Sequence, residues 1–276
     1  MENELRDLLP EFWQKKFEST KKEYIKLTFS NEGPLDLKTS KAGGVGYLPV
    51  TENYPRNTET GMPLFLLTQI NFEELPVCSG FPEKGILAFY VDYTDDLIGV
   101  DYEQSENRAG YHVFYFKDDR TTSYTKEQQE EIQKEAVEGN ELYAVVDGEF
   151  RITGSLDAQI LNTDSYEFKK IFGKTMFEWL KDITDDSELE EKIYNALHKG
   201  ATGSKIGGYP FFTQEDPRIY EAKTEYDTLL FQLDTEKIGD SWSIMWGDMG
   251  VANFFINHQA LQQKDFTKIL YNWDCG

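Results

Sequence analysis

Residues 40–44 read SKAGG, and the same pattern returns as SKIGG at residues 204–208, an offset of 164 positions. Three further pairs of blocks follow in the same order, with offsets between 162 and 165: Pro55-Arg56 and Pro217-Arg218, LTQIN at 67–71 and LFQLD at 230–234, and EKGILAFYV at 83–91 and DMGVANFFI at 248–256. A period this long, present in two copies, is not typical of a solenoid. The repeat predicts two similar β units packed about a pseudo-twofold axis.

Around these blocks the hydrophobic pattern predicts mostly strands. Residues 24–29 alternate polar and apolar side chains with a period of two. Short apolar runs predict further strands at 64–70, 85–93, 112–116, 228–233 and 251–256, and two more within 142–152 around the turn Asp147-Gly148. Because the strands cluster in hairpins, antiparallel pairing is favoured. We expect a mainly β or α+β fold, an antiparallel β-roll built from two internally duplicated β units with flanking helices.

Helices are expected at the N-terminus, in the middle and near the end of the chain. Residues 3–22 carry an apolar stripe at helical spacing, interrupted by Pro10. Capping boxes at Thr125, Thr175 and Ser187 predict three helix starts, and a last helix is expected at 259–270. We expect a single domain, 1–276, with an N-terminal helical segment at 1–22, a first β unit with an insertion at 24–162, a helical block at 163–200 and a second β unit at 201–276.

The charge of the chain excludes several classes of partner. Fifty Asp and Glu residues against 28 Lys and Arg give a formal net charge of −22. Nucleic-acid binding requires a clustered basic face, and an anionic membrane would repel this chain. No apolar run approaches the ~18 residues of a membrane span. We therefore expect no nucleic-acid and no membrane partner, and a basic protein is the partner that this charge would attract at long range.

The N-terminus and the cysteines indicate the compartment. No apolar signal segment opens the chain, and its cysteines are Cys78 and Cys275. This pattern predicts a cytoplasmic protein with reduced thiols.

Cofactor and metal motifs are missing from the sequence. GGVG at 43–46 lacks the spacing of a dinucleotide-binding loop, and the three histidines are scattered. The strongest calcium candidate begins at Asp92, but it has Leu97 where an EF-hand loop requires glycine. We expect no cofactor and no metal.

The repeated motifs resemble those of a known family. The SKxGG loop, the LTQIN strand and the turn WGDMG at 246–250, which precedes FFI, resemble the YwqG-like family of bacterial proteins of unknown function. The resemblance spans the chain from about residue 24 to the end. It implies a cytoplasmic protein with a mainly antiparallel β-roll and flanking helices, and it supplies no activity and no catalytic residues.

Two glutamines occupy matching positions of the repeat. Gln69 and Gln232 each lie inside an apolar strand, where an amide costs free energy unless its hydrogen bonds are made. In one interpretation each glutamine pairs with the backbone of a loop of its own unit. In the other, both amides line a pocket between the units and bind a ligand.

Two lysines and two acids also match across the repeat. Lys41 and Lys205 begin the Gly-Gly loops, and Glu83 and Asp248 precede the last repeated strands. If the units face each other, these groups could meet near the pseudo-twofold axis. They would then form either salt bridges and turn caps or a general acid–base pair.

These observations favour a non-catalytic binding or interaction protein, because no strong catalytic motif is present and two duplicated units can enclose a cleft. Its ligand is not specified by the sequence, and a basic protein partner would engage the acidic surface. The candidate binding residues are those of the repeat: Lys41, Gln69, Glu83, Lys205, Gln232 and Asp248. The alternative is a hydrolase-like enzyme that uses lysine and carboxylates at the interface of the units.

Overall fold

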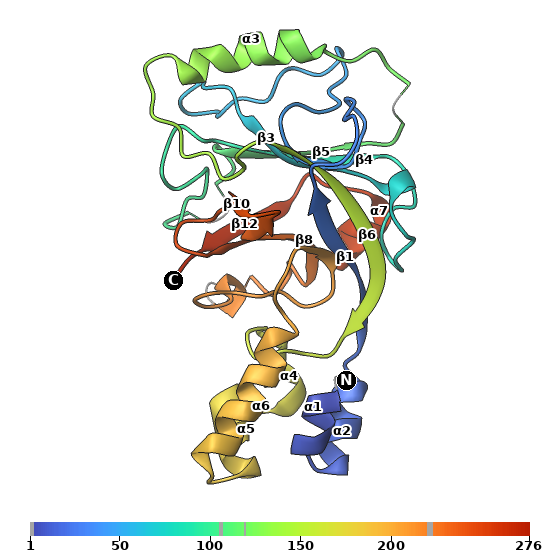
Figure 1. The fold of residues 1–276 in the computed structure, drawn as a ribbon, viewed down its shortest axis with the longest axis vertical. Coiled ribbons are helices and arrows are strands. Elements are labelled where there is room, and N and C mark those ends of the chain that lie inside the picture. Colours follow the sequence, from blue (N-terminus) through green and yellow to red (C-terminus); the bar gives the residue numbers. More distant parts are fainter. Residues whose placement is uncertain (1–2, 105–106, 119, 220–222) are drawn as a thin grey trace.

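A single antiparallel sheet dominates the computed structural model, which describes residues 3–104, 107–118, 120–219 and 223–276 (Figure 1). Its ten strands run in the order β12 (Ile269–Asp274), β11 (Val251–Ile256), β8 (Thr228–Asp234), β7 (Lys205–Gly207), β1 (Lys22–Ser30), β6 (Glu149–Gln159), β2 (Lys41–Gly43), β3 (Phe65–Asn71), β4 (Ile86–Val91) and β5 (Tyr111–Phe116). A separate hairpin joins β9 (Glu236–Ile238) to β10 (Ser241–Ile244). The predicted mainly antiparallel fold is confirmed.

The two long strands β1 and β6 form the centre of the sheet and relate its halves. They pair over their full length with Thr28 opposite Thr153. The other edge of β1 pairs with β7, and the other edge of β6 pairs with β2. Lys205 stands opposite Lys26 on one side, and Lys41 stands opposite Arg151 on the other. A pseudo-twofold axis between the two threonines therefore exchanges β1 with β6.

The predicted duplication extends outward from this centre. In β2 and β3 Lys41 pairs with Gln69, and in β7 and β8 Lys205 pairs with Gln232. Each unit also has a register irregularity at the same place, beside Leu67 in the first unit and beside Leu230 in the second. Since a slip by one residue would turn every side chain to the opposite face, the shared irregularity preserves the same core face in both units.

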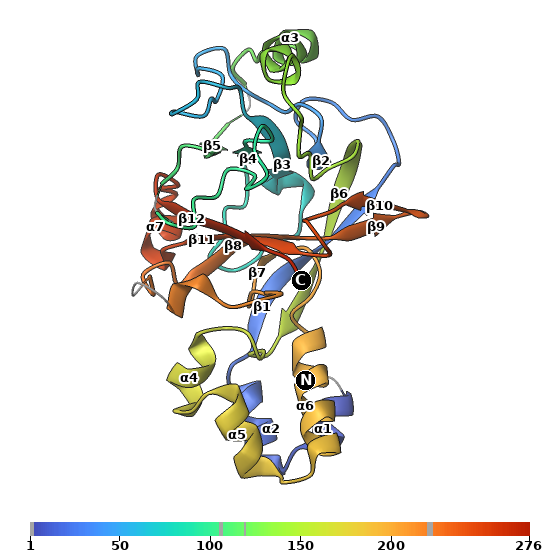
Figure 2. The same cartoon turned by 90° about the vertical axis from the view of Figure 1, so that its left-hand side faces the viewer.

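The sheet bends so that its two halves face each other across the main core (Figures 1 and 2). Phe89 of β4 packs against Phe231 of β8 and Phe254 of β11, with ring centroids 4.8 and 4.7 Å apart. Aromatic pairs at these distances add to the free energy gained by burying the rings. The strands in this core are buried on both faces, as shown by the fully buried β4 and β11.

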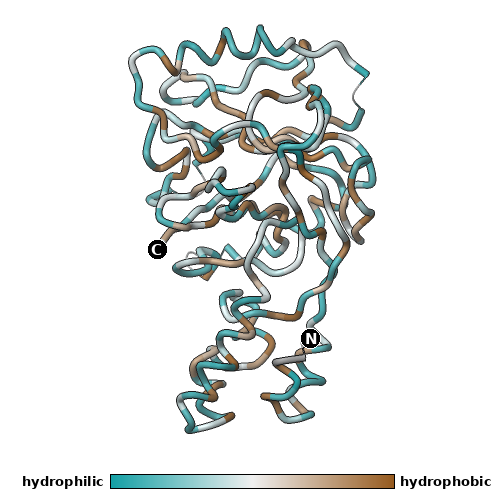
Figure 3. The backbone as a smooth tube through the Cα atoms, in the orientation of Figure 1, coloured by the Kyte–Doolittle hydropathy of each residue, from teal (hydrophilic) through white to brown (hydrophobic). Residues whose placement is uncertain are grey.

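Helices lie at both ends of the molecule, and α7 (His258–Gln263) lies beside the sheet between them (Figure 2). One group has its own core around Phe17 and Trp179 and contains α1 (Asn3–Leu8), α2 (Glu11–Glu18), α4 (Glu167–Phe172), α5 (Met176–Ile183) and α6 (Ser187–Lys199). At the other end lies α3 (Lys126–Val137), which is mostly hydrophilic (Figure 3). In the part of the chain that the structure describes, no helix has the length and apolar character needed to cross a membrane.

Local capping signals predicted two of these helix starts and came within one residue of a third. The boxes at Thr125 and Thr175 form as predicted, with the hydroxyl oxygen accepting from the backbone N–H of Gln128 and Glu178. The third prediction was wrong by one residue, because Asp186 caps α6 and Ser187 is already helical. Pro10 separates α1 from α2 at the position where its missing N–H costs no helical hydrogen bond.

One strand prediction and one helix prediction need correction. Residues 142–152 do not form two strands, because only β6 starts there, at Glu149, and Val146 makes an isolated bridge to Ile244 instead. The expected helix at 259–270 ends early: α7 spans His258–Gln263 and Lys264 closes it in a left-handed conformation. The chain then enters β12, whose residues are all buried and so show no alternating pattern. Two short 3-10 helices, Phe72–Glu74 and Pro217–Ile219, complete the elements.

Candidate binding cleft

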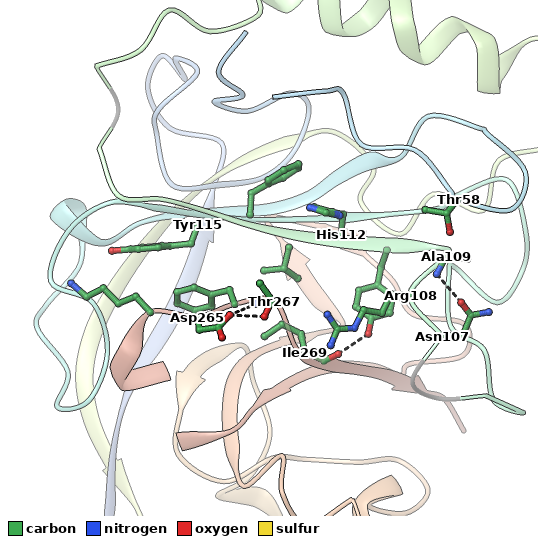
Figure 4. A pocket seen from close by; sticks show the side chains of 14 residues that line it. Thr58, Asn107, Arg108, Ala109, His112, Tyr115, Asp265, Thr267 and Ile269 are labelled. Carbon is green, nitrogen blue, oxygen red and sulfur yellow. Dashed lines mark hydrogen bonds between the residues drawn. The ribbon is translucent and has the colours of Figure 1, made fainter. Parts of the chain in front are cut away.

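A cleft of about 570 Å³ lies between β5 and the loop that joins α7 to β12 (Figure 4). This volume lies within the range of small-molecule and cofactor sites in proteins, roughly 300–1,000 Å³. One wall comes from the first unit, with residues 107–109 and the strand β5, and the other comes from the second unit, with residues 264–269. The cleft therefore lies where the outer strands of the two duplicated units approach each other.

Among the described strands none pairs with the edge of β5 that faces the cleft, because β5 ends the strand order of the sheet. Antiparallel pairing directs alternate residues toward the neighbouring strand. Gly110 faces β4, since its carbonyl accepts from Asp92 N–H at 2.8 Å. Every second residue from Gly110 onward therefore turns its peptide groups toward β4. The residues between them, Tyr111, Val113 and Tyr115, turn theirs to the outer edge, and all three line the cleft.

The opposite edge of the sheet, at β12, is covered by side chains of the first unit. The Tyr111 hydroxyl donates to the carbonyl of Ile269 at 2.7 Å, and the Tyr102 hydroxyl donates to the carbonyl of Trp273 at 2.6 Å. The Trp273 indole N–H donates in turn to the carbonyl of Leu97 at 2.6 Å. These bonds satisfy outward-facing groups of β12, as an added strand would.

Arg108 supplies the main positive charge of the cleft. It stands in the loop ahead of β5, and its carbonyl accepts a long hydrogen bond from Tyr111 N–H at 3.5 Å. Figure 4 shows its guanidinium directed into the space between β5 and the segment that leads into β12. Lys264 lines the same cleft from the end of α7. In a chain with a net charge of −22, this is a local concentration of cations.

The loop from α7 to β12 is held by its own turn and by an aromatic contact. The Asp265 carboxylate accepts from the backbone N–H of Thr267 at 3.0 Å and also from its hydroxyl. Phe266 is buried, and its ring lies 4.8 Å from that of Tyr115 on β5. This contact closes one end of the cleft, and the bond from Tyr111 to Ile269 ties the walls together at the other end.

The charge of Arg108 affects the titration of its neighbours. Burial lowers the pKa of His112, and the positive charge of Arg108 lowers it further. The hydrogen bonds from Thr267 lower the pKa of Asp265, with smaller contributions from Lys268 and Arg108. Burial raises the pKa of Tyr111, against opposing contributions from Arg108 and from the backbone N–H of Tyr271. At neutral pH His112 is therefore uncharged and Asp265 is ionised.

Each repeated glutamine is hydrogen-bonded to the backbone of its own unit. Gln69 accepts from Tyr47 N–H at 2.7 Å and donates to the carbonyls of Leu37 and Thr39 at 3.0 and 2.9 Å. The side chains of Gln69 and of its equivalent in the second unit, Gln232, are fully buried. The equivalent Gln232 accepts from Phe211 N–H at 2.8 Å and donates to the carbonyls of Ala201 and Gly203 at 3.1 and 2.8 Å. All six partners are related by an offset of 164 residues.

The repeated lysines are both buried, but their partners differ. Lys41 forms an ion pair with Glu149, with Nζ 2.8 Å from Oε1, and also donates to the carbonyl of Asp36. Lys205 donates instead to three neutral oxygens, the carbonyls of Ala201 and Tyr209 and the side-chain oxygen of Gln159. Burial lowers the pKa of Lys205 to about 7.

The repeated acids lie apart from these lysines. Glu83 and Asp248 are exposed, just before β4 and β11. Among the residues that the structure describes, no ion pair joins either acid to Lys41 or Lys205. The expected meeting of these four groups at the axis is not observed, since the strands near the axis are β1 and β6.

The calcium candidate Asp92 is hydrogen-bonded to neighbouring protein groups, and the two cysteines are free thiols. The Asp92 carboxylate accepts from the backbone and hydroxyl of Thr94 and from the amide of Asn57. In the described part of the chain, no cluster of three or more His, Cys, Asp or Glu residues is arranged to hold a metal. Cys78 and Cys275 are not bonded to each other.

The residues that carry the cleft were not among the predicted binding residues. Arg108 and Lys264 are separated by more than half of the sequence, and the bend of the sheet brings them to the same cleft. The strand 112–116 was predicted, and Tyr111 and Tyr115 were recognisable only as two of many aromatic residues. A sign available in the sequence was the lack of a repeated counterpart for this strand among the four matched blocks.

Comparison with known protein families gives a match over most of the chain. The model of the family described as "Domain of unknown function (DUF1963)" matches residues 40–275. A comparison with curated proteins finds no match. The matched range begins at the first SKxGG loop and ends after β12, so it includes the strands from β2 to β12 and both walls of the cleft. The chain therefore belongs to the family of the domain of unknown function DUF1963.

Proposed function

We propose that this protein is a non-catalytic binding protein whose ligand lies in the cleft between β5 and the loop from α7 to β12. The observation that carries the proposal is the open outer edge of β5 in a cleft of about 570 Å³, beside Arg108. Such a cleft combines apolar surface with a few directed polar groups, as ligand sites in proteins commonly do.

The surroundings of the predicted candidate residues support binding more than catalysis. Lys41 and Lys205 are both 1% exposed and bonded within their own units, so neither presents an amine to a substrate. Gln69 and Gln232 use their amides on backbone groups. Glu83 and Asp248 lie on the surface and remain available to a partner.

The partner class follows from charge. A net charge of −22 attracts a basic protein, because the acidic residues of the surface outweigh the few cations of the cleft in the overall field. We also propose that the chain is a YwqG-like member of its family, because its SKxGG loop and WGDMG turn resemble those of YwqG-like proteins. On the same resemblance we propose that it is a cytoplasmic bacterial protein.

A fragment screen by NMR tests the proposed site. Aromatic carboxylates of low molecular mass serve as probes, because the cleft offers Arg108 beside Tyr115 and Phe266. We expect the bound fragments to shift the amide signals of residues 111–115 and 264–269. In Arg108→Gln, the fragments should bind more weakly and these shifts should become smaller. Lys134→Gln, on the distant α3, is the matched control and should leave the shifts in place. Fragments that bind only elsewhere would contradict the proposed site.

A further inference from the structure

The outer edge of β5 has unpaired main-chain groups that point into the cleft. Pairing with β4 uses the even-numbered residues from Gly110 onward, so Val113 and Tyr115 turn their N–H and C=O groups outward. No described residue forms a backbone hydrogen bond with these outward groups. An edge of this kind is a template for another strand unless it is blocked.

The molecule blocks its other edge, which makes the open edge of β5 more informative. Tyr102 and Tyr111 donate to the outward carbonyls of β12, and Tyr271 donates to the carbonyl of Ile98 in the loop that covers it. On β5, the Tyr115 hydroxyl instead donates to the carbonyl of Lys84, on its own side of the sheet. Side chains thus replace a neighbouring strand at β12 and leave the space beside β5 free.

We propose that the cleft receives an extended segment of a basic partner protein, which adds a strand to β5 and places a carboxylate against Arg108. This inference rests on the proposed function of the cleft. Main-chain hydrogen bonds to Val113 and Tyr115 would supply sequence-independent affinity, and alternate side chains of the segment would contact the two walls.

Charge supports this choice of occupant. The acidic chain as a whole attracts a basic protein, whereas the cleft itself offers Arg108 and Lys264. Asp265 also lines the cleft and contributes one negative charge, and its Oδ1 accepts two hydrogen bonds from Thr267. A guanidinium recognises a carboxylate through paired hydrogen bonds, so an acidic side chain in the inserted segment fixes the register of the added strand.

Peptides selected from a random displayed library against the full-length chain provide the probe. One selected peptide is synthesised in two forms, with N-methyl groups on alternate residues in one form and on the remaining residues in the other. Since a strand presents only every second N–H to a given neighbour, we expect one form to lose binding and the other to keep it. Arg108→Gln should weaken the unmodified peptide.

A variant of the protein tests the same bonds from the other side. Val113→Pro removes an outward N–H and no bond to β4, so we expect at least about tenfold weaker peptide binding, or ~1.4 kcal/mol. Val113→Thr keeps the donor and should retain binding. Circular dichroism reports whether Val113→Pro folds, and the two N-methylated peptides provide the test if it does not.

The outcomes separate the two proposals. Equal binding by both N-methylated forms, combined with weakening by Arg108→Gln, would overturn strand addition and leave ligand binding in the cleft. Strand addition would also be overturned if the selected peptides bound Arg108→Gln and Val113→Pro as tightly as the unchanged protein. The same conclusion would follow if the selection enriched no peptide. The fragment screen then decides separately whether the cleft binds a ligand.

Discussion

The two outer edges of the sheet occupy equivalent positions in the duplicated units, but their main-chain groups have different partners. The carbonyls of Ile269 and Trp273 on β12 are bonded by tyrosine hydroxyls from the other unit. The outward groups of Val113 and Tyr115 on β5 face a cleft instead. Duplication thus preserves the backbone register, while changes in loops and side chains determine which edge stays open.

The buried lysines show the same principle near the axis. Gly43 stands opposite Glu149, and its equivalent Gly207 stands opposite Tyr24. Lys41 therefore has a carboxylate partner, whereas Lys205 lies 5.6 Å from the ring of Tyr24 and is bonded to neutral oxygens. One substitution across the repeat converts an ion pair into an isolated buried cation.

The largest expected effect follows from this difference. Lys41→Met leaves Glu149 without its cation, so we expect a loss of about 3 kcal/mol in the free energy of unfolding at pH 7. Lys205→Met removes a desolvated cation, which offsets the loss of its hydrogen bonds, and should cost less than about 1 kcal/mol. Urea denaturation measures both variants. Equal losses would show that the two lysines have equivalent environments despite their different partners.

The two glutamines should behave alike. Gln69→Ala and Gln232→Ala each orphan one N–H and two carbonyls of a buried loop, at an expected cost of about 1–3 kcal/mol each. The two losses should agree within about 0.5 kcal/mol, because their partners correspond residue by residue. A stable variant that loses ligand binding would favour the pocket interpretation instead.

The repeated blocks predicted the paired strands well because Gly, Gln and apolar patterns constrain the backbone locally. The match between KLTFS at 26–30 and RITGS at 151–155 was missed, because its offset of 125 differs from that of the other blocks. The helices α4 to α6, inserted between β6 and β7, account for this change. The register therefore favours a second unit that starts at β6 rather than at residue 201.

The cleft could not be predicted from local patterns. Strand β12 is buried on both faces, so its residues do not alternate, and the end of α7 at Lys264 depends on a single left-handed residue. Arg108 and Asp265 meet only through the bend of the sheet. Motifs of neighbouring residues carry no information on such contacts.

The pH dependence of stability sharpens the lysine comparison. The pKa of Lys205 is about 7 in the folded protein, against about 10.4 in an unfolded chain. Below pH 7 both states hold the proton and the full cost of the buried charge is present. From pH 7 to 9 the unfolded state holds more protons, so stability should gain up to about 1.4 kcal/mol per pH unit from this group.

Lys205→Met isolates that contribution. The variant should lose this gain between pH 7 and 9, and Lys41→Met should retain it, in urea denaturation at each pH. An unchanged pH dependence in Lys205→Met would show that its three neutral acceptors keep the amine protonated.

The smallest expected effect concerns the blocked edge. Tyr102→Phe removes the hydroxyl that bonds Trp273, at an expected cost of about 1 kcal/mol. Tyr115→Phe, on β5, removes a more exposed bond to the carbonyl of Lys84 and should cost less than about 0.5 kcal/mol. Thermal denaturation compares the two. A larger loss of stability in Tyr115→Phe than in Tyr102→Phe would contradict the conclusion that tyrosine hydroxyls close the edge of β12 and not that of β5.

Native-state amide hydrogen exchange tests most directly whether the two edges differ. In the free protein, the outward amides of Val113 and Tyr115 face the cleft, whereas that of Tyr271 lies in the buried strand β12 beside the Tyr111 hydroxyl. We predict protection of the Val113 and Tyr115 amides that is about 100-fold lower than that of Tyr271. Equal protection of all three amides would mean that the β5 edge is already closed, and would contradict an open edge in the cleft.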